Sequence, residues 1–339
     1  MLIDMHAHVV PDGFPSAEGR AGANRWPRIE EADGARALVS GQMRLPLSEA
    51  WYDAERRLAA MDANAVDAEV VSPLPPLLNY RVPAADAVDL CRGVNEFIAR
   101  LCEVAPSRFY GLGTVPMQDP DLACAALSEV REMGLQGVEI GSNVCGVSLG
   151  DDRLLGFFQE AERLGVPIFV HALDPTVGDR LPPAAMAGFG FATEVSLAAA
   201  SLVASGTAER CPGLRLAFSH GAGGFPLMLT RAEWFHTGAW NEEPPSGPPP
   251  GPPGAKRLPR TPTEYARRFY YDTLVFDRRA LRYLVDMIGP SQLLIGTDFP
   301  AMPREQPAGR TLRSLGLPDD QVEAITWHNC FRFLGTAPR

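Results

Sequence analysis

Short apolar runs alternate with longer amphipathic stretches along nearly the whole chain. Eight runs rich in β-branched and aromatic residues predict strands, and eight stretches with apolar residues at helical spacing predict helices. The expected strands cover residues 2–10, 68–73, 109–115, 137–142, 167–173, 215–220, 269–276 and 292–298. The expected helices cover residues 49–64, 84–104, 121–133, 153–164, 192–205, 225–235, 278–288 and 319–333.

This alternation predicts βαβ units, in which each crossover helix returns the chain to a parallel strand. Eight such units in 339 residues predict an α/β fold, a (β/α)8 barrel of TIM type. An open doubly wound sheet is the main alternative. It is disfavoured because no expected strand is followed by the G-x-G-x-x-G or P-loop pattern of nucleotide-binding sheets. We therefore expect residues 1–339 to form a single barrel domain.

Two segments interrupt the alternation. Residues 11–48 form a long, polar and glycine-rich insertion after the first strand. Residues 244–262, before the seventh strand, hold nine prolines and three glycines, a composition that excludes a helix or a central strand. We expect the second segment to be an exposed loop, and a tolerated surface insertion is its simplest interpretation.

Charge and composition exclude several classes of partner. The chain has 31 Lys+Arg and 41 Asp+Glu, a formal net charge of −10, and no basic cluster, which disfavours nucleic acid and anionic membranes as partners. The N-terminus has no basic region before an apolar run, and no stretch of about 18 apolar residues predicts a membrane span. The six cysteines form no C-x-x-C pair, which indicates reduced thiols in a cytoplasmic protein.

Four of the six histidines, at positions 6, 8, 171 and 220, end or lie within expected strands, and barrel enzymes carry their chemistry at the C-terminal ends of strands. His6 and His8 are two positions apart on the first strand, so their side chains point to the same face, about 6–7 Å apart along the strand. Two such imidazoles can chelate one metal ion, and a pair of structural histidines is the alternative. Asp4 shares their face and is expected to orient a ligand. His171 closes an apolar strand as a third ligand, or as a core histidine bonded to backbone.

A carboxylate and a further histidine complete the candidate site. Asp298 ends another apolar strand, where burying a carboxylate is costly unless the carboxylate meets a cation or a donor. His6, His8, His171 and Asp298 then make an N3O site that leaves a position for water or substrate, as catalytic zinc sites do. His220 is free to act as a general acid or base. A fifth ligand or a structural histidine is the alternative for this residue.

Several motifs, taken in order, resemble those of the amidohydrolase superfamily. They are Ile-Asp-Met-His-Ala-His, Phe-Tyr-Gly-Leu-Gly-Thr-Val-Pro-Met-Gln, Gly-Val-Glu-Ile-Gly-Ser, Ile-Phe-Val-His, Phe-Ser-His-Gly-Ala-Gly-Gly-Phe-Pro and Ile-Gly-Thr-Asp-Phe-Pro. The likeness covers nearly the whole chain apart from the proline-rich segment. It is greatest to the decarboxylase branch typified by 2-amino-3-carboxymuconate-6-semialdehyde decarboxylase.

The resemblance implies a mononuclear active site. It implies that the N3O set holds one Zn²⁺, with Mn²⁺ as the alternative, and that His220 activates the zinc-bound water. The fourth strand offers no lysine to bridge two metals, which agrees with one ion. The resemblance also implies that Arg44 and Arg231 grip a substrate carboxylate with their planar guanidinium groups, Arg231 reaching in from the second subunit of a homodimer.

The chain departs from this branch at positions where the branch has large aromatic side chains. Ala172 and Leu173 follow the histidine of the fifth strand, a small residue near Ala187 replaces a tryptophan, and Ala301 follows the aspartate of the eighth strand. Each aromatic side chain fills a large volume, so the pocket has lost several bulky groups. The resemblance therefore implies the same chemistry on a different substrate, which is larger than the muconate semialdehyde or has another shape.

The leading hypothesis is metal-dependent, non-oxidative decarboxylation of an unsaturated or aromatic carboxylic acid, a carbon–carbon lyase reaction that needs no organic cofactor. The metal would serve as the Lewis acid. The same site could instead serve a hydratase or a hydrolase of lactones or amides. A barrel that binds without catalysis is a third hypothesis, because fold alone does not prove activity.

Overall fold

The computed structural model describes residues 1–239 and 257–338. Eight strands in these residues form one parallel sheet. Its neighbouring strands all run parallel. In sheet order they are β1 (Ile3–Val9), β5 (Ala68–Pro73), β6 (Phe109–Gly113), β7 (Gly137–Gly141), β10 (Ile168–His171), β11 (Leu216–Phe218), β12 (Tyr270–Asp272) and β13 (Leu293–Leu294).

Backbone hydrogen bonds return the last strand to the first. The amide of Met5 donates to the carbonyl of Ile295 at 2.8 Å, and the amide of His8 donates to the carbonyl of Phe299 at 2.7 Å. A parallel bridge between Ala7 and Phe299 continues this contact. The sheet therefore closes on itself, and the predicted (β/α)8 barrel is confirmed.

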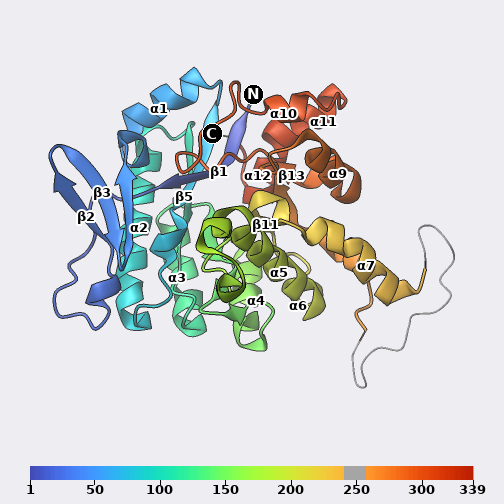
Figure 1. Cartoon of the computed structure of the whole chain (residues 1–339), viewed down its shortest axis with the longest axis horizontal. Helices are drawn as coiled ribbons and strands as arrows, with labels where there is room; N and C mark the ends of the chain where they lie inside the picture. The colour runs from blue at the N-terminus through green and yellow to red at the C-terminus, as the bar shows by residue number, and fades with distance from the viewer. Residues whose placement is uncertain (240–256, 339) are drawn as a thin grey trace.

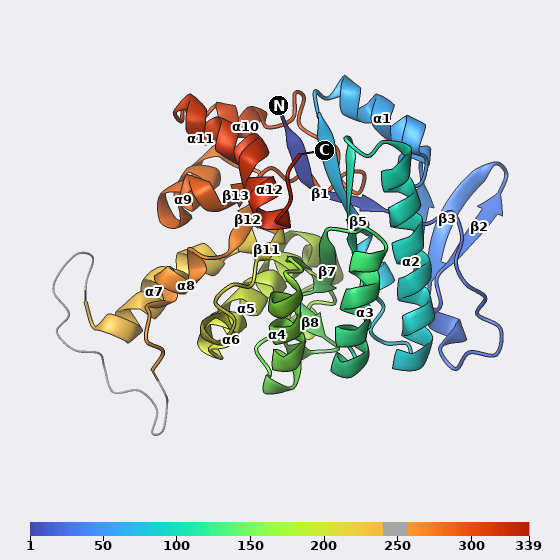
Figure 2. The same ribbon diagram turned by 180° about the vertical axis from the view of Figure 1, so that it is seen from behind.

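Helices surround this barrel, as Figures 1 and 2 show from opposite sides. The major ones are α1 (Ala54–Ala63), α2 (Ala84–Val104), α3 (Pro120–Glu132), α4 (Leu155–Leu164), α5 (Phe191–Ala204), α7 (Phe225–Thr237) and α9 (Arg278–Ile288). The last predicted helix is a run of α11 (Asp319–Glu323), a π turn (Ala324–His328) and α12 (Asn329–Leu334). Short helices α6 (Thr207–Arg210), α8 (Pro262–Ala266) and α10 (Arg310–Arg313) lie in the connections.

The strands are buried along their length because helices cover the outer face of the barrel. Each residue of β1, β5, β6 and β7 is buried. Continuous burial explains why the sequence shows apolar runs rather than strict alternation in these strands. It also means that each polar side chain on them needs a partner inside the protein.

The insertion at residues 11–48 contains a small antiparallel sheet, which stands beside the barrel in Figure 1. Its strands are β2 (Arg28–Ala32), β3 (Ala35–Ser40) and β4 (Met43–Leu47). The first turn is Asp33-Gly34, with φ of 51° and 76°, the left-handed pair that a two-residue hairpin requires. The sequence pattern of this segment predicts no strands, so these three strands are a difference between the prediction and the structure.

The expected proline-rich loop lies mostly outside the described residues, which resume at residue 257. The described part leads into α8, where Thr261 and Glu264 form a capping box. The prediction of an exposed loop at residues 244–262 therefore stays a prediction.

Residues 183–204 form one helical run that is long and apolar enough to cross a membrane by length and composition alone. Within it, α5 buries Val195, Ala199 and Leu202 in the main core cluster and packs against β10. A core helix of a barrel has this composition, because its inner face meets the sheet.

Candidate metal centre

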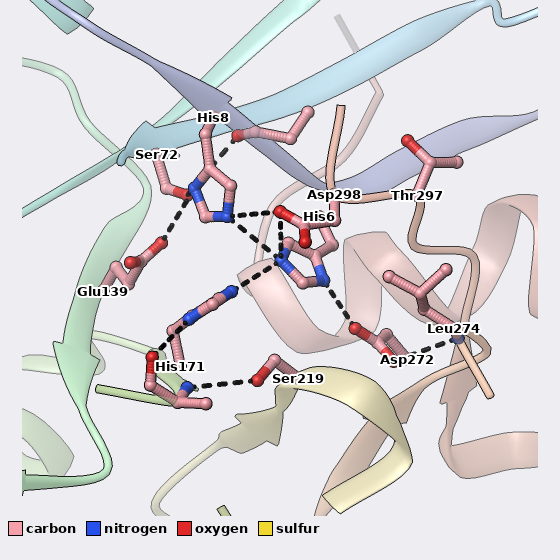
Figure 3. A network of polar contacts seen from close by, with 12 residues as sticks. His6, His8, Ser72, Glu139, His171, Ser219, Asp272, Leu274, Thr297 and Asp298 are labelled. Atoms are coloured by element: carbon pink, nitrogen blue, oxygen red, sulfur yellow. Dashed lines mark hydrogen bonds and ion pairs between the residues drawn. The ribbon is translucent and has the colours of Figure 1, made fainter. Parts of the chain in front are cut away.

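His6, His8, His171 and Asp298 converge at one end of the barrel (Figure 3). One ligand atom from each lies within 4.8 Å of the others. The Nε2 atom of His6 is 3.1 Å from Nε2 of His8 and 3.0 Å from Nε2 of His171. The Oδ1 atom of Asp298 is 3.1 Å from Nε2 of His8. The structure thus brings together the four residues that the sequence analysis selected as ligands.

The opposite nitrogen of each imidazole, Nδ1, has an acceptor of its own. In each case the acceptor lies within hydrogen-bond distance: Asp272 Oδ2 for His6 (2.6 Å), the Pro73 carbonyl for His8 (3.0 Å) and the Ala172 carbonyl for His171 (2.9 Å). These acceptors require a hydrogen on Nδ1, so the Nε2 lone pairs are left to face a common point.

Three lone pairs and a carboxylate oxygen at these separations repel one another unless a cation lies between them. Metal–nitrogen bonds of about 2.0–2.1 Å at tetrahedral angles place ligand atoms about 3.3 Å apart. The separations of 3.0–3.1 Å, together with 3.6 Å between Nε2 of His6 and Oδ1 of Asp298, lie around that value, so the residues fit one divalent ion. Burial disfavours a charge on His6, but the hydrogen bond to Asp272 and the nearby carboxylates outweigh burial and raise the pKa of His6 to about 9. The site therefore attracts positive charge.

His220 lies beside this group without joining it. Its ring centroid is 5.3 Å from that of His6 and 5.3 Å from that of His171, and its side chain lines the cavity above them. Burial and the charge of His6 lower the pKa of His220. A neutral imidazole facing the substrate space can accept a proton.

Two of these residues have strained backbones. His220 has φ of 52° and Asp298 has φ of 60°, both in the left-handed region that non-glycine residues rarely adopt. The amide of Asp298 donates to the carbonyl of His6 at 2.7 Å, so barrel closure holds this residue in place. Strain of this kind concentrates at functional sites, where the surrounding structure fixes a side chain in a working position.

Asp272 is a further candidate site residue, which the sequence patterns did not single out. Its Oδ2 lies 2.6 Å from Nδ1 of His6, and its Oδ1 accepts the amide of Leu274 at 3.1 Å (Figure 3). The same Oδ1 accepts the amide of Gly221 at 2.9 Å. The sequence pattern that marks Asp272 is the same as for Asp298: each is a carboxylate at the end of an apolar strand. Asp4, which we expected to orient a ligand, contacts no imidazole. It accepts instead from the backbone amide of His6 at 3.2 Å.

Replacing Asp272 by Asn is expected to weaken metal binding by about 10–100-fold, because outer-shell carboxylates raise the basicity of the histidine ligand. A chelator-competition titration of the purified variant measures this affinity. Asp174→Asn is the control, because Asp174 is a carboxylate of the cavity wall that contacts Arg81 rather than a ligand. Equal affinity in Asp272→Asn and the wild type would contradict the role of this carboxylate.

A buried network of four charges lies next to the ligands. Arg57 Nε donates to Glu69 Oε2 at 2.7 Å, Arg304 Nη2 donates to Asp4 Oδ2 at 2.9 Å, and Arg304 also pairs with Glu69. Arg57 Nη1 donates to the carbonyl of His8 at 2.8 Å. The network thus ties α1, β1, β5 and the segment after β13 together around the metal ligands.

Arg57→Met is expected to lower the free energy of unfolding by about 3–5 kcal/mol, because it leaves the buried Glu69 short of one positive partner. Urea denaturation measures the change. The neighbouring pair of Arg56 and Glu49 is exposed, so Arg56→Met is a matched control with an expected loss below about 1 kcal/mol. Equal losses in the two variants would rule out a special contribution of the buried network.

The two arginines expected to grip a carboxylate are not part of the cavity of this chain. Arg44 pairs with Glu30 and is 54% exposed, while its neighbours Met43 and Leu45 line the cavity. Alternation along β4 points Arg44 to the opposite face. Arg231 lies exposed on α7 with its guanidinium 5.0 Å from the ring centroid of Phe235.

A cavity of about 1010 Å³ opens above the four candidate ligands. His171, His220 and Asp298 line it, together with apolar side chains that include Trp51, Leu74, Phe191 and Met302. The small residues expected in place of aromatic ones, Ala172, Ala187 and Ala301, line it as well. Its volume is at the upper end of the range of about 300–1,000 Å³ for ligand pockets.

Comparisons with known proteins agree with this arrangement. A family model described as Amidohydrolase matches residues 3–336. A 2-amino-3-carboxymuconate-6-semialdehyde decarboxylase of Dictyostelium discoideum is 31% identical over 343 residues, covering 100% of this chain and 92% of the relative. The crystal structure of 5-carboxyvanillate decarboxylase LigW from Sphingomonas paucimobilis has a TM-score of 0.81 at 26% identity, covering 99% of both chains. A dihydroxybenzoic acid decarboxylase from a Polaromonas species, solved with bound manganese, has a TM-score of 0.72 at 20% identity over 98% of this chain and 96% of that one.

Proposed function

Because the chain belongs to the amidohydrolase family, we propose that it is a metal-dependent decarboxylase, a carboxy-lyase that acts on an unsaturated or aromatic carboxylic acid. The observation that carries this proposal is the convergence of three imidazoles and a carboxylate below a large, mainly apolar cavity. The decarboxylase relatives support the choice of reaction.

When bound, a divalent cation supplies a Lewis acid and lowers the pKa of a coordinated water. In the reaction the bond to the carboxyl carbon breaks, its electron pair stays on the substrate carbon, and that carbon takes up a proton as CO2 leaves. His220 is placed beside the ligands to accept a proton from water and return it to the substrate carbon. The hydroxide that remains takes up a proton from solvent, so the net change is the exchange of the carboxylate for a proton. Asp298 would complete the ligand set that holds the metal beside His220.

We assign zinc as the metal, with manganese as the alternative. Three histidines and one carboxylate form a ligand set that suits Zn²⁺, and the close spacing of the nitrogens agrees with bonds of about 2.0–2.1 Å. The manganese of the Polaromonas structure favours the alternative. Metal analysis of the purified protein distinguishes the two.

We propose that the protein works as a cytoplasmic homodimer in which Arg231 reaches the cavity of the second subunit. Leu227, Met228 and Phe235 expose apolar side chains on α7 next to Arg231. Such a patch is typical of a surface that another protein covers. In this arrangement Arg231 adds a positive charge to the partner's cavity.

The reaction type is tested by incubating the zinc- or manganese-loaded protein with a panel of aromatic and unsaturated carboxylic acids and identifying the products by mass spectrometry. A decarboxylase releases CO2 and returns a product lighter by that mass. A hydratase or a hydrolase of lactones or amides returns products heavier by one water. Products of the second kind, with no CO2 released, would replace the proposed reaction.

A further inference from the structure

The ring of His220 depends on its backbone for its direction. Unlike the three candidate ligand histidines, it makes no hydrogen bond from a ring nitrogen to any residue in 1–239 or 257–338. A group that exchanges a proton with a substrate has to be held within about 0.5 Å of its working position. The direction of the ring therefore rests on the main chain of residues 219–224, here called the His220 turn.

The main chain of the His220 turn is strained. Four consecutive residues, 220–223, have φ between 52° and 58°, and two of them, His220 and Ala222, are not glycine. The left-handed region costs energy for a residue with a Cβ atom, because that atom crowds the following carbonyl. Such a conformation persists only where surrounding contacts enforce it. The contacts made by the turn are therefore the ones that place the ring.

Ser196, a buried serine of α5, binds the end of this turn. Its Oγ accepts the amide of Gly224 at 2.7 Å. The same oxygen lies 2.6 Å from the carbonyl of Ala192, in its own helix, and 3.1 Å from the carbonyl of Ala222, in the turn. A serine inside a helix usually bonds only to the carbonyl one turn back. Here the hydroxyl also joins the helix to the turn that carries His220.

The His220 turn lies directly against α5. An ideal Cβ atom on Gly223 would lie 2.0 Å from the carbonyl oxygen of Ala192 and 2.6 Å from Oγ of Ser196, so only glycine allows this approach. Nearer His220, Asp272 accepts the amide of Gly221 at 2.9 Å. The turn is thus held by a serine of the helix and by the carboxylate that also contacts a candidate metal ligand.

We propose that Ser196 is a positioning residue for His220: its hydroxyl fixes the His220 turn and thereby directs the imidazole into the cavity. This rests on the proposed function, in which His220 moves the proton. Ser196 does not line the cavity and is not one of the four candidate ligands, so it acts only through the turn. Loss of the hydroxyl leaves the amide of Gly224 without its acceptor and releases one end of a strained segment.

Ser196→Ala is expected to lower kcat for CO2 release by about 10–100-fold, because moving a reacting group by about 1 Å costs up to about 100-fold. KM and the content of one metal ion per chain are expected to stay unchanged. Ser201→Ala is the matched control: on the same helix, Ser201 donates to the carbonyl of Ala198 at 2.8 Å and accepts the amide of Gly150 at 3.2 Å. These bonds lie outside the His220 turn, so the control is expected to keep wild-type kcat. Steady-state kinetics on the metal-loaded full chain measure both variants.

The double variant Ser196→Ala/His220→Ala separates positioning from a general loss of structure. If Ser196 acts through His220, adding Ser196→Ala to His220→Ala lowers kcat no further, because the two residues work as one unit. A further loss of about 10–100-fold in the double variant would overturn the proposal. A wild-type kcat in the single variant Ser196→Ala would overturn it as well.

Hydrogen exchange followed by mass spectrometry tests the turn without any substrate. Peptides that cover residues 219–225 are expected to exchange faster in Ser196→Ala than in the wild type, because the amide of Gly224 loses its acceptor, and at the wild-type rate in Ser201→Ala. Unchanged exchange in Ser196→Ala would overturn the proposal. A wild type that releases no CO2 from any acid would overturn the proposed function, whereas the exchange rates would still decide whether Ser196 fixes the turn.

Discussion

Replacing His220 by alanine is expected to leave one metal ion bound per chain and to lower kcat by about 10²–10⁴-fold, the usual contribution of a general acid or base. The four candidate ligand atoms come from other residues, so removing this ring leaves the ligand set intact. The ring lines the cavity beside His6 and His171, so removing it takes away a proton acceptor that faces the cavity. Metal analysis and steady-state kinetics on the same preparation measure both effects.

His328→Ala is the control for this variant. His328 is exposed and pairs with Glu323 on the surface, so its loss is expected to change neither metal content nor turnover. If His220→Ala loses its metal, His220 is a ligand rather than an acid or base. If the variant keeps wild-type turnover, the proton is handled by another group.

Replacing His171 by alanine is expected to abolish stoichiometric metal binding and, with it, turnover. This residue is the candidate ligand from β10, opposite the two candidate ligands on β1, so its loss is expected to open one side of the site. Loss of a residue that only orients a ligand lowers metal affinity by about 10–100-fold. Loss of His171 is expected to lower the metal affinity by more than this. Chelator competition measures the affinity, and circular dichroism checks that the barrel is folded.

In a second part of this experiment, free imidazole is added to the variants. The deletion leaves space for one ring between His6 and the cavity, so added imidazole is expected to restore part of the metal binding in His171→Ala and none in Asp298→Ala. A His171→Ala protein with wild-type metal affinity would contradict the assignment of this residue as a ligand.

The barrel was predictable because buried parallel strands leave a signal that does not depend on distant residues. Apolar runs marked each strand, and the errors are confined to strand ends: the run at residues 269–276 became a strand only over Tyr270–Asp272. The strands of the insertion were missed, although Asp33-Gly34 is a strong hairpin signal. Of its two flanking strands, β2 has no buried residue and β3 buries only Ala37, Leu38 and Val39, so neither shows the long apolar run that marked the barrel strands.

His171 and Asp298 were predictable by one physical test, a polar side chain that ends an apolar strand, and His6 and His8 by their i, i+2 spacing on one face of the first strand. Asp272 passes the same test and was missed because no motif directed attention to it. The pairing of Arg304 with Asp4 and Glu69 gave no local signal, since it joins residues 300 and 235 positions apart. The direction of Arg44 depends on the register of β4, which only the folded insertion sets.

The most direct test of metal-dependent decarboxylation at a single site is a titration of metal-free protein with Zn²⁺ or Mn²⁺. CO2 release from an acid substrate is followed during the titration. We predict no CO2 release without metal and a linear rise in rate that stops at one ion per chain, because the four candidate ligand atoms form a single site. CO2 release that persists in the metal-free protein would contradict a metal-dependent reaction. A rate that rises until two ions are bound would contradict a single metal site.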